Sequence, residues 1–161
     1  MLSLSSIRIT QFKNYDISPF HFSDRLIGIC GPNGRGKTNL MDAIHYCSFT
    51  KSYFGGTDGM NIQFGKDGFR LEANFVKNGK NEQFLCVLKP PSKKDVSLNG
   101  VSYEKLSHHI GQFPCVMIVP DDIEIINGSS ELRRKWLDTL ISQIDSEYLE
   151  ALITYNKLIQ Q

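Results

Sequence analysis

The 161 residues contain 18 Lys and Arg against 17 Asp and Glu, which gives a formal net charge of +1. This balance excludes an overall basic field that would draw the chain to nucleic acid or to an anionic membrane, so any such contact must come from a local patch. With 40% hydrophobic residues the chain can bury roughly 70% of its unfolded surface, and it has neither a secretory segment nor an apolar run of about 18 residues. We therefore expect a cytoplasmic protein with its own folded core and no membrane association.

The first predicted elements surround a glycine-rich loop. Ile7 and Ile9 alternate with polar residues within 5–10, which predicts a strand, and the apolar run 25–30 predicts a second strand that ends at the loop. Beyond the loop, apolar residues recur every three or four positions and predict a helix from Lys37 to Phe49. The order strand, glycine loop, helix is typical of a phosphate-binding site.

The middle of the chain has the alternation of antiparallel strands. Apolar and polar residues alternate over 69–75 and again over 84–88, with the turn-forming sequence NGKN at 78–81 between them, which predicts a hairpin. Asn99-Gly100 predicts a second tight turn. The run 115–119, CVMIV, is typical of a buried strand.

The last part of the chain has helical periodicity. From about Ser130 an apolar stripe predicts a helix with Trp136 in its core-facing side, and a second stripe follows a predicted cap at Asp145-Ser146.

The glycine loop carries specific chemistry. Gly31, Gly36, Lys37 and Thr38 fit the pattern G-x4-G-K-[ST], in which glycines let backbone N–H groups surround phosphate oxygens at the positive end of a helix. Lys37 is expected on the β and γ phosphates as a catalytic residue, and Thr38 is expected to offer its hydroxyl to Mg²⁺. We predict that ATP is bound by the whole loop: Gly31, Pro32, Asn33, Gly34, Arg35, Gly36, Lys37 and Thr38.

P-loop enzymes also use an acidic residue at the end of an apolar strand to organise Mg²⁺ and the attacking water. The comparable place in this sequence is CVMIVPDD, which makes Asp121 and Asp122 candidate catalytic carboxylates. Two other interpretations stay open: these aspartates are turn or cap residues at the start of a helical segment, or they assist near the γ-phosphate without being the principal metal ligand.

Several segments together resemble the RecF family of bacterial ABC/SMC-type ATPases. They are IRITQFKNY (7–15), GPNGRGKTNLMDAIHYCSFTKSY (31–53), VPDDIEIINGSSELRRKWLD (119–138) and ISQIDSEYLEALITYNKLIQQ (141–161). The resemblance covers nearly the whole chain. Its most specific parts are Phe-Lys-Asn-Tyr at 12–15, the phosphate loop, and the block from Gly128 to Asp138.

The resemblance implies an α/β fold: a P-loop NTPase of the ABC-ATPase head type with an antiparallel β subdomain, ending in the start of an α-helical lobe. Residues 1–119 would be the N-terminal part of the ATPase lobe and 120–161 the beginning of the helical lobe. The family's signature motif, its Walker B acidic pair and its D-loop have no counterpart in these residues. We therefore interpret the chain as an N-terminal fragment that lacks the C-terminal half of the ATPase head.

The resemblance also implies function. Such proteins act in DNA replication and in the repair of DNA damage linked to the SOS response: two heads close on two ATP molecules, bind DNA near gaps or junctions, and help to load RecA with RecO and RecR partners. The complete protein would be a slow, DNA-stimulated ATPase that dimerises with ATP, and this chain alone is expected to be inactive. The rival hypothesis is a P-loop small-molecule or nucleotide kinase, but a kinase should alternate strand and helix after the loop, whereas residues 69–101 predict consecutive strands.

Position by position, Lys13 and Asn14 match the family's Arg-Asn, which lies near the ribose and base side of the nucleotide. Asp121 and Asp122 match the family's Q-loop region, where the usual Ser-Pro-Glu-Asp is replaced by Val119-Pro120-Asp121-Asp122. The segment 51–53 matches a head surface that could face DNA. Two clusters of basic residues could either be exposed to solvent or contact phosphate. They are Lys89, Lys93 and Lys94 in a proline-containing loop, and Arg133, Arg134 and Lys135 on a helix.

Overall fold

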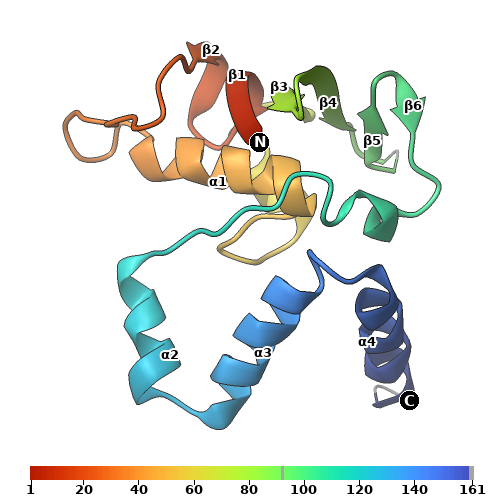
Figure 1. The fold of residues 1–161 in the computed structure, drawn as a ribbon. Helices are drawn as coiled ribbons and strands as arrows, with labels where there is room; N and C mark the ends of the chain where they lie inside the picture. The colour runs from red at the N-terminus through yellow and green to blue at the C-terminus, as the bar shows by residue number, and fades with distance from the viewer. Residues whose placement is uncertain (92, 160–161) are drawn as a thin grey trace. The chain divides into compact units, whose positions relative to one another are not determined.

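The computed structural model describes residues 1–91 and 93–159, and Figure 1 shows its helices and strands. The chain divides into two units, Met1–Glu104 and Lys105–Gln161, which are described separately. The expected domain boundary after residue 119 does not coincide with this division. That expected boundary stays a prediction. No helix among the described residues combines the length and the apolar character needed to cross a bilayer.

The first unit is built on one antiparallel sheet with the strand order β2-β1-β3-β4-β5-β6. The strands are β1 (Leu2–Phe12), β2 (Tyr15–His21), β3 (Phe69–Lys77), β4 (Lys80–Leu88), β5 (Asp95–Leu98) and β6 (Val101–Ser102). The predicted β3–β4 hairpin is confirmed, and Asn78 and Gly79 at its turn both have the positive φ that a two-residue hairpin requires. The turn at Asn99-Gly100 is confirmed in the same way.

Helix α1 (Lys37–Phe49), with the predicted bounds, lies along one face of this sheet (Figure 1). The strands place alternate side chains on that face, where Ile9, Leu71 and Cys86 are completely buried. Phe12, Tyr46 and Phe69 meet edge to face, with ring centroids 5.2 to 5.8 Å apart. This aromatic cluster fixes α1 against the end of β1, where the turn to β2 begins.

Two predicted strands are wrong. Residues 25–30 and 115–119 belong to no strand, and Leu26 and Ile118 are 88% and 78% exposed. A strand must pair its backbone N–H and C=O groups with a neighbour, and neither segment takes part in the strand pairing of the described residues. Apolar composition alone therefore predicts an extended conformation but does not show whether a neighbouring strand is present to pair with it.

In contrast, β2 was not predicted. Its sequence YDISPFH alternates poorly and contains Pro19, which argues against a central strand. The structure places β2 at the edge of the sheet, where one side of the strand needs no hydrogen-bonding partner, so the proline is tolerated.

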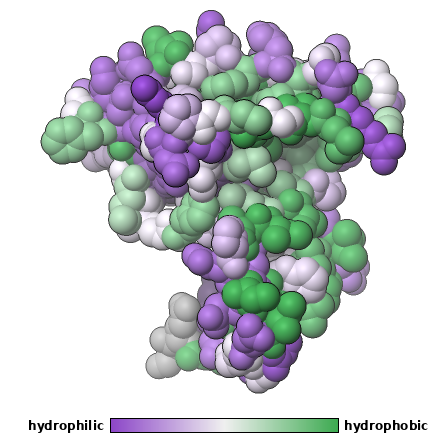
Figure 2. Space-filling model, turned by 90° about the vertical axis from the view of Figure 1, so that its left-hand side faces the viewer, coloured by the Kyte–Doolittle hydropathy of each residue, from purple (hydrophilic) through white to green (hydrophobic). Residues whose placement is uncertain are grey.

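The second unit is helical. It contains the short helices η2 (Leu106–His109), η3 (Pro120–Ile123) and α2 (Glu124–Asn127), followed by α3 (Ser130–Ile141) and α4 (Ser146–Ile159). The predicted cap is confirmed, because the Asp145 carboxylate accepts the backbone N–H of Tyr148 at 3.0 Å. The prediction that Trp136 is a core residue is wrong, since it is 41% exposed and no residue of α3 is buried. On the face drawn in Figure 2, hydrophobic side chains likewise reach the surface among hydrophilic ones.

A partly buried ionic cluster holds the C-terminal end of α1. The Lys94 ammonium lies 2.7 Å from the Asp58 carboxylate and donates to the Thr50 carbonyl at 2.6 Å and to the Tyr46 hydroxyl at 3.2 Å. Tyr46 in turn donates to Asp58 at 2.6 Å, and burial raises the pKa of its phenol. The expectation that Lys94 lies in an exposed loop is wrong, since its side chain is only 11% exposed.

Replacing Lys94 by methionine is therefore expected to lower the free energy of unfolding by about 2 kcal/mol, because the substitution removes the cation paired with the Asp58 carboxylate and the side-chain donor to the Thr50 carbonyl. The exposed neighbour Lys93 provides a matched control. Lys93→Met should change the free energy of unfolding by less than about 0.5 kcal/mol. Urea unfolding of both variants checks this, and equal values would contradict the structural role of Lys94.

Candidate functional site

The glycine loop leads directly into the N-terminus of α1. Gly36 is the N-cap residue of α1, with φ +96°, and no side chain caps the helix or places a negative charge in its first turn. The first backbone N–H groups of a helix have no partner within the helix, and the helix dipole gives this end a partial positive charge. The arrangement suits a phosphate group, which would satisfy these donors.

Lys37 and Thr38 lie in the first turn of this helix. The Lys37 ammonium donates hydrogen bonds to the carbonyls of Gly31 at 2.7 Å and Pro32 at 2.9 Å, so the side chain folds back over the loop that it follows. Thr38 is exposed. An ammonium in this position lies beside the loop that would surround a phosphate, and the Thr38 hydroxyl is accessible to a hydrated cation.

The β1–β2 turn packs against the end of the loop. A Cβ atom added at Gly36 would lie 2.5 Å from Asn14 Nδ2, and Asn39 donates to Asn14 Oδ1 at 2.7 Å. The Tyr15 hydroxyl donates to the Gly36 carbonyl at 2.9 Å, and burial raises the pKa of this phenol, which keeps it protonated as a donor. The predicted residue Asn14 is thus in contact with the loop, whereas Tyr15 and Asn39 were not among the predicted site residues.

Lys13, in the same turn, contacts α1 and is only partly exposed to solvent. Its ammonium lies 2.5 Å from the carboxylate of Asp42, a completely buried residue of α1. The same ammonium lies 5.1 Å from the ring centroid of Phe54. Asp42 was not among the residues predicted from the sequence. The one feature that could have indicated a buried role is the presence of a carboxylate inside a helical segment that is otherwise rich in apolar residues.

The structure places the candidate carboxylates in the second unit. Asp122 accepts the backbone N–H of Val119 at 2.7 Å through its carboxylate, and its own N–H donates to the Val119 carbonyl at 3.0 Å. This reciprocal pair is the geometry of a turn residue at the start of η3. Within residues 1–91 and 93–159, no cluster of three or more His, Cys, Asp or Glu could hold a metal ion. A catalytic role for Asp121 or Asp122 stays a prediction.

The basic residues of α3 already have partners within the second unit. Arg133 donates to the Gly128 carbonyl at 3.0 Å, Arg134 to the Ser130 hydroxyl at 3.2 Å, and Lys135 forms an exposed ion pair with Glu131 at 2.7 Å. These local contacts are those of a solvated helix face.

The segment 51–53 is mixed in character. Lys51 is exposed, whereas Ser52 is buried and donates to the Asp42 carboxylate at 2.8 Å. Of these two residues only Lys51 is exposed to solvent, so a DNA-facing role for the segment stays a prediction, and Ser52 has a structural partner.

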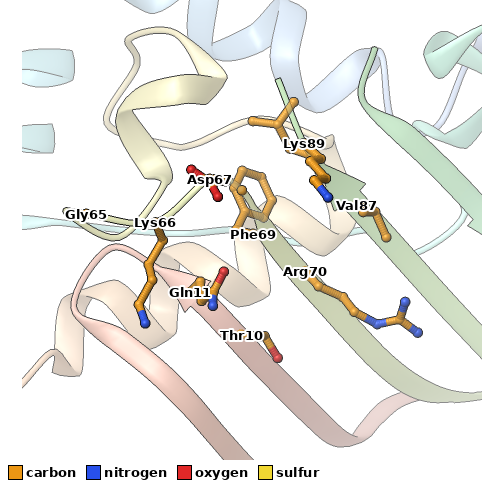
Figure 3. A pocket seen from close by; sticks show the side chains of 11 residues that line it. Thr10, Gln11, Gly65, Lys66, Asp67, Phe69, Arg70, Val87 and Lys89 are labelled. Atoms are coloured by element: carbon orange, nitrogen blue, oxygen red, sulfur yellow. The ribbon is translucent and has the colours of Figure 1, made fainter. Parts of the chain in front are cut away.

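A cavity of about 330 Å³ lies at the ends of β1, β3 and β4 and beside the loop 65–68 (Figure 3). Lys66, Arg70 and Lys89 line it together with Asp67, but Figure 3 shows the three cationic side chains pointing in different directions. Arg70 also pairs with Glu72 at 2.9 Å. These cations do not converge on one point, as a single anion site would require.

The chain is similar to several known proteins. The AAA domain family matches residues 6–160. The DNA replication and repair protein RecF of Flavobacterium johnsoniae is 41% identical over 160 residues, which cover 99% of this chain and 45% of that protein. RecF of Bacteroides fragilis is 42% identical and is covered over 43% of its length. The chain thus spans less than half of the length of these relatives.

A solved structure described as the recombination mediator protein RecF with ATP, in the RecFOR pathway, superimposes with a TM-score of 0.89. It is 29% identical over 97% of this chain, which covers 43% of that structure. The head domain of the SMC protein from Thermotoga maritima is also similar, with a TM-score of 0.56 and 26% identity over 78% of this chain and 51% of that one. These likenesses confirm the predicted resemblance and the predicted fold class, a P-loop ATPase head of the ABC type.

Proposed function

The chain belongs to the AAA domain family, and from this premise we propose that it is the ATP-binding N-terminal part of a RecF-like DNA replication and repair protein. The observation that carries the proposal is the uncapped N-terminus of α1 behind an intact G-x4-G-K-T loop, with Lys37 folded over that loop. Support comes from the similarity to a RecF structure described with ATP. A cytoplasmic location is part of the same proposal.

In this proposal each group at the site has a defined task. Backbone N–H groups of residues 31–36 and of the first turn of α1 hold the phosphates, and Lys37 exchanges its carbonyl partners for the β and γ phosphate oxygens. Thr38 provides one oxygen ligand to Mg²⁺, whose other ligands are phosphate oxygens and water. Lys13 and Asn14 border the site on the side assigned to the ribose and base.

In the proposed complete protein, ATP closes two heads over DNA, and hydrolysis reopens them. The groups that place the attacking water and stabilise charge on the γ-phosphate would come from sequence beyond these residues and from a second head. Turnover by this chain alone is therefore expected at background level. RecO- and RecR-type partners and the loading of RecA belong to the complete protein in this proposal. The kinase alternative is not favoured, because the relatives and the similar structures are RecF and SMC proteins.

DNA binding provides the test of this function. With a net charge of only +1, the chain is expected to bind fluorescent duplex DNA with a dissociation constant weaker than about 10 µM at physiological salt, with no response to ATP. A protein extended to the length of the relatives should bind more tightly, and ATP should strengthen that binding. Fluorescence anisotropy with both proteins checks this.

Two results would contradict the proposal. Tight, ATP-stimulated DNA binding by the 161 residues alone would show that they contain more of the DNA-binding apparatus than is proposed. Failure of the extended protein to bind gapped or junction DNA with ATP would remove the DNA function itself.

A further inference from the structure

The carboxylate of Asp42 is the centre of a buried polar cluster in the first unit. Asp42 is completely buried, and its carboxylate accepts the Ser52 hydroxyl and the Tyr53 backbone N–H, each at 2.8 Å. Its third contact is the Lys13 ammonium at 2.5 Å. A buried carboxylate is strongly disfavoured unless it is paired and hydrogen-bonded, so Lys13 supplies the charge that this position requires.

The pairing also fixes the β1–β2 turn. Lys13 adopts a positive φ of 52°, a conformation that non-glycine residues hold only when their surroundings impose it. The next two residues of the turn, Asn14 and Tyr15, contact Gly36 as described above. The Asp42–Lys13 pair therefore lies at one end of a turn whose other end supports the last glycine of the phosphate loop.

We infer that Asp42 is a positioning residue for the nucleotide site: by holding Lys13, it keeps the 13–15 turn packed against Gly36 and so preorganises the loop for phosphate. This inference rests on the proposed nucleotide-binding function. Asp42 need not touch the nucleotide, because it acts through Lys13 and the turn. A preorganised loop binds phosphate more tightly because less conformational freedom is lost on binding.

The aromatic contacts of Lys13 are a weaker restraint. Its ammonium lies 5.1 Å from the ring of Phe54 and 5.7 Å from the ring of Phe12. A cation–π contact of a partly exposed lysine stabilises less than a charge pair with a buried carboxylate. In the structure the Lys13 side chain is 18% exposed. Without the charge of Asp42, this side chain is free to move into solvent, and the turn is no longer held.

Asp42→Asn tests the inference, because asparagine has nearly the same shape and can still accept the Tyr53 N–H while it removes the charge that holds Lys13. The affinity for Mg·ATP, measured by calorimetry, should fall about tenfold. Ser52→Ala is the matched control: it removes a neutral donor from the same carboxylate but leaves Lys13 paired, and it should change the affinity less than about twofold. Thermal unfolding confirms that each variant is folded.

Three further variants separate positioning from a direct contact or a loss of stability. Lys13→Met should weaken binding as Asp42→Asn does, the double variant should show no additional loss, and Lys13→Arg, which keeps the charge, should retain affinity. Binding of tripolyphosphate should fall in parallel with that of ATP, because the affected element is the phosphate loop. A loss confined to ATP would instead assign Lys13 to the base and ribose and overturn the inference.

Equal affinity of the unaltered chain and folded Asp42→Asn would overturn the inference and leave the nucleotide site intact. Additive losses in the double variant would overturn it too. If Asp42→Asn does not fold, the comparison of Lys13→Met with Lys13→Arg, using ATP and tripolyphosphate, decides the same question. Absence of Mg·ATP binding by the unaltered chain is a distinct result, which would remove the proposed function together with this inference.

Discussion

Replacement of Gly36 by alanine is expected to weaken Mg·ATP binding about 100-fold. Gly36 has φ +96°, outside the conformations that residues with a Cβ readily adopt, which costs roughly 1–2 kcal/mol. The added methyl group would also lie 2.5 Å from Asn14 Nδ2 and 2.7 Å from Asn14 Oδ1, so the Asn14 side chain must move away from the loop and from its donor Asn39. The free loop is expected to relax and relieve this strain and collision, so restoring the phosphate-binding conformation costs about 3 kcal/mol, or roughly 100-fold in affinity.

Gly34→Ala is the matched control for this substitution. Gly34 also has a positive φ, of 80°, but a Cβ added there would have no heavy atom within 4 Å. The control therefore carries backbone strain without the collision, and it should weaken binding less than Gly36→Ala. Calorimetric titration of both folded variants measures the difference. If the two substitutions weaken binding equally, the contact between Asn14 and Gly36 has no part in shaping the loop.

Local sequence patterns were sufficient to predict several elements. The bounds of α1 follow from an apolar period of three to four residues that begins at the end of a glycine loop. The β3–β4 hairpin follows from alternation on both sides of Asn78-Gly79, whose residues tolerate the positive φ of the turn. In both cases the information lies within about 20 residues of sequence.

The failed strand predictions depend on partners that a local pattern does not contain. Residues 25–30 and 115–119 have the apolar composition of buried strands, yet no strand among the described residues pairs with them. The same reason explains the error at Trp136, because a helical stripe shows which side of a helix is apolar but not what covers it.

The candidate site also contains both residues that the local sequence predicts and residues that depend on tertiary packing. The phosphate loop follows from its motif, because the glycine and lysine spacing reflects a single local structure. Asp42, Tyr15 and Asn39 were not predicted, since their roles depend on where the β1–β2 turn meets α1. Lys13 and Asp42, for example, are paired across 29 positions of sequence by the packing of a sheet against a helix.

Lys37→Ala is the second substitution with a large expected effect. Its ammonium is held over the loop by the carbonyls of Gly31 and Pro32, beside the uncapped N-terminus of α1. Hydrogen bonds to charged groups contribute about 1.5–3 kcal/mol each, so loss of an ammonium that contacts two phosphates should weaken binding about 100-fold. Arg35→Ala removes the same charge from the same loop, where Arg35 is exposed, and should have a much smaller effect.

Calorimetric titration of the unaltered chain and Lys37→Ala with ATP, each with Mg²⁺ and with Mg²⁺ chelated, tests the central claim most directly. The account predicts Mg²⁺-dependent binding by the unaltered chain and about 100-fold weaker binding by Lys37→Ala, with the same thermal unfolding midpoint for both proteins. Equal affinity for ATP in the two folded proteins would contradict the assignment of this loop as the nucleotide site.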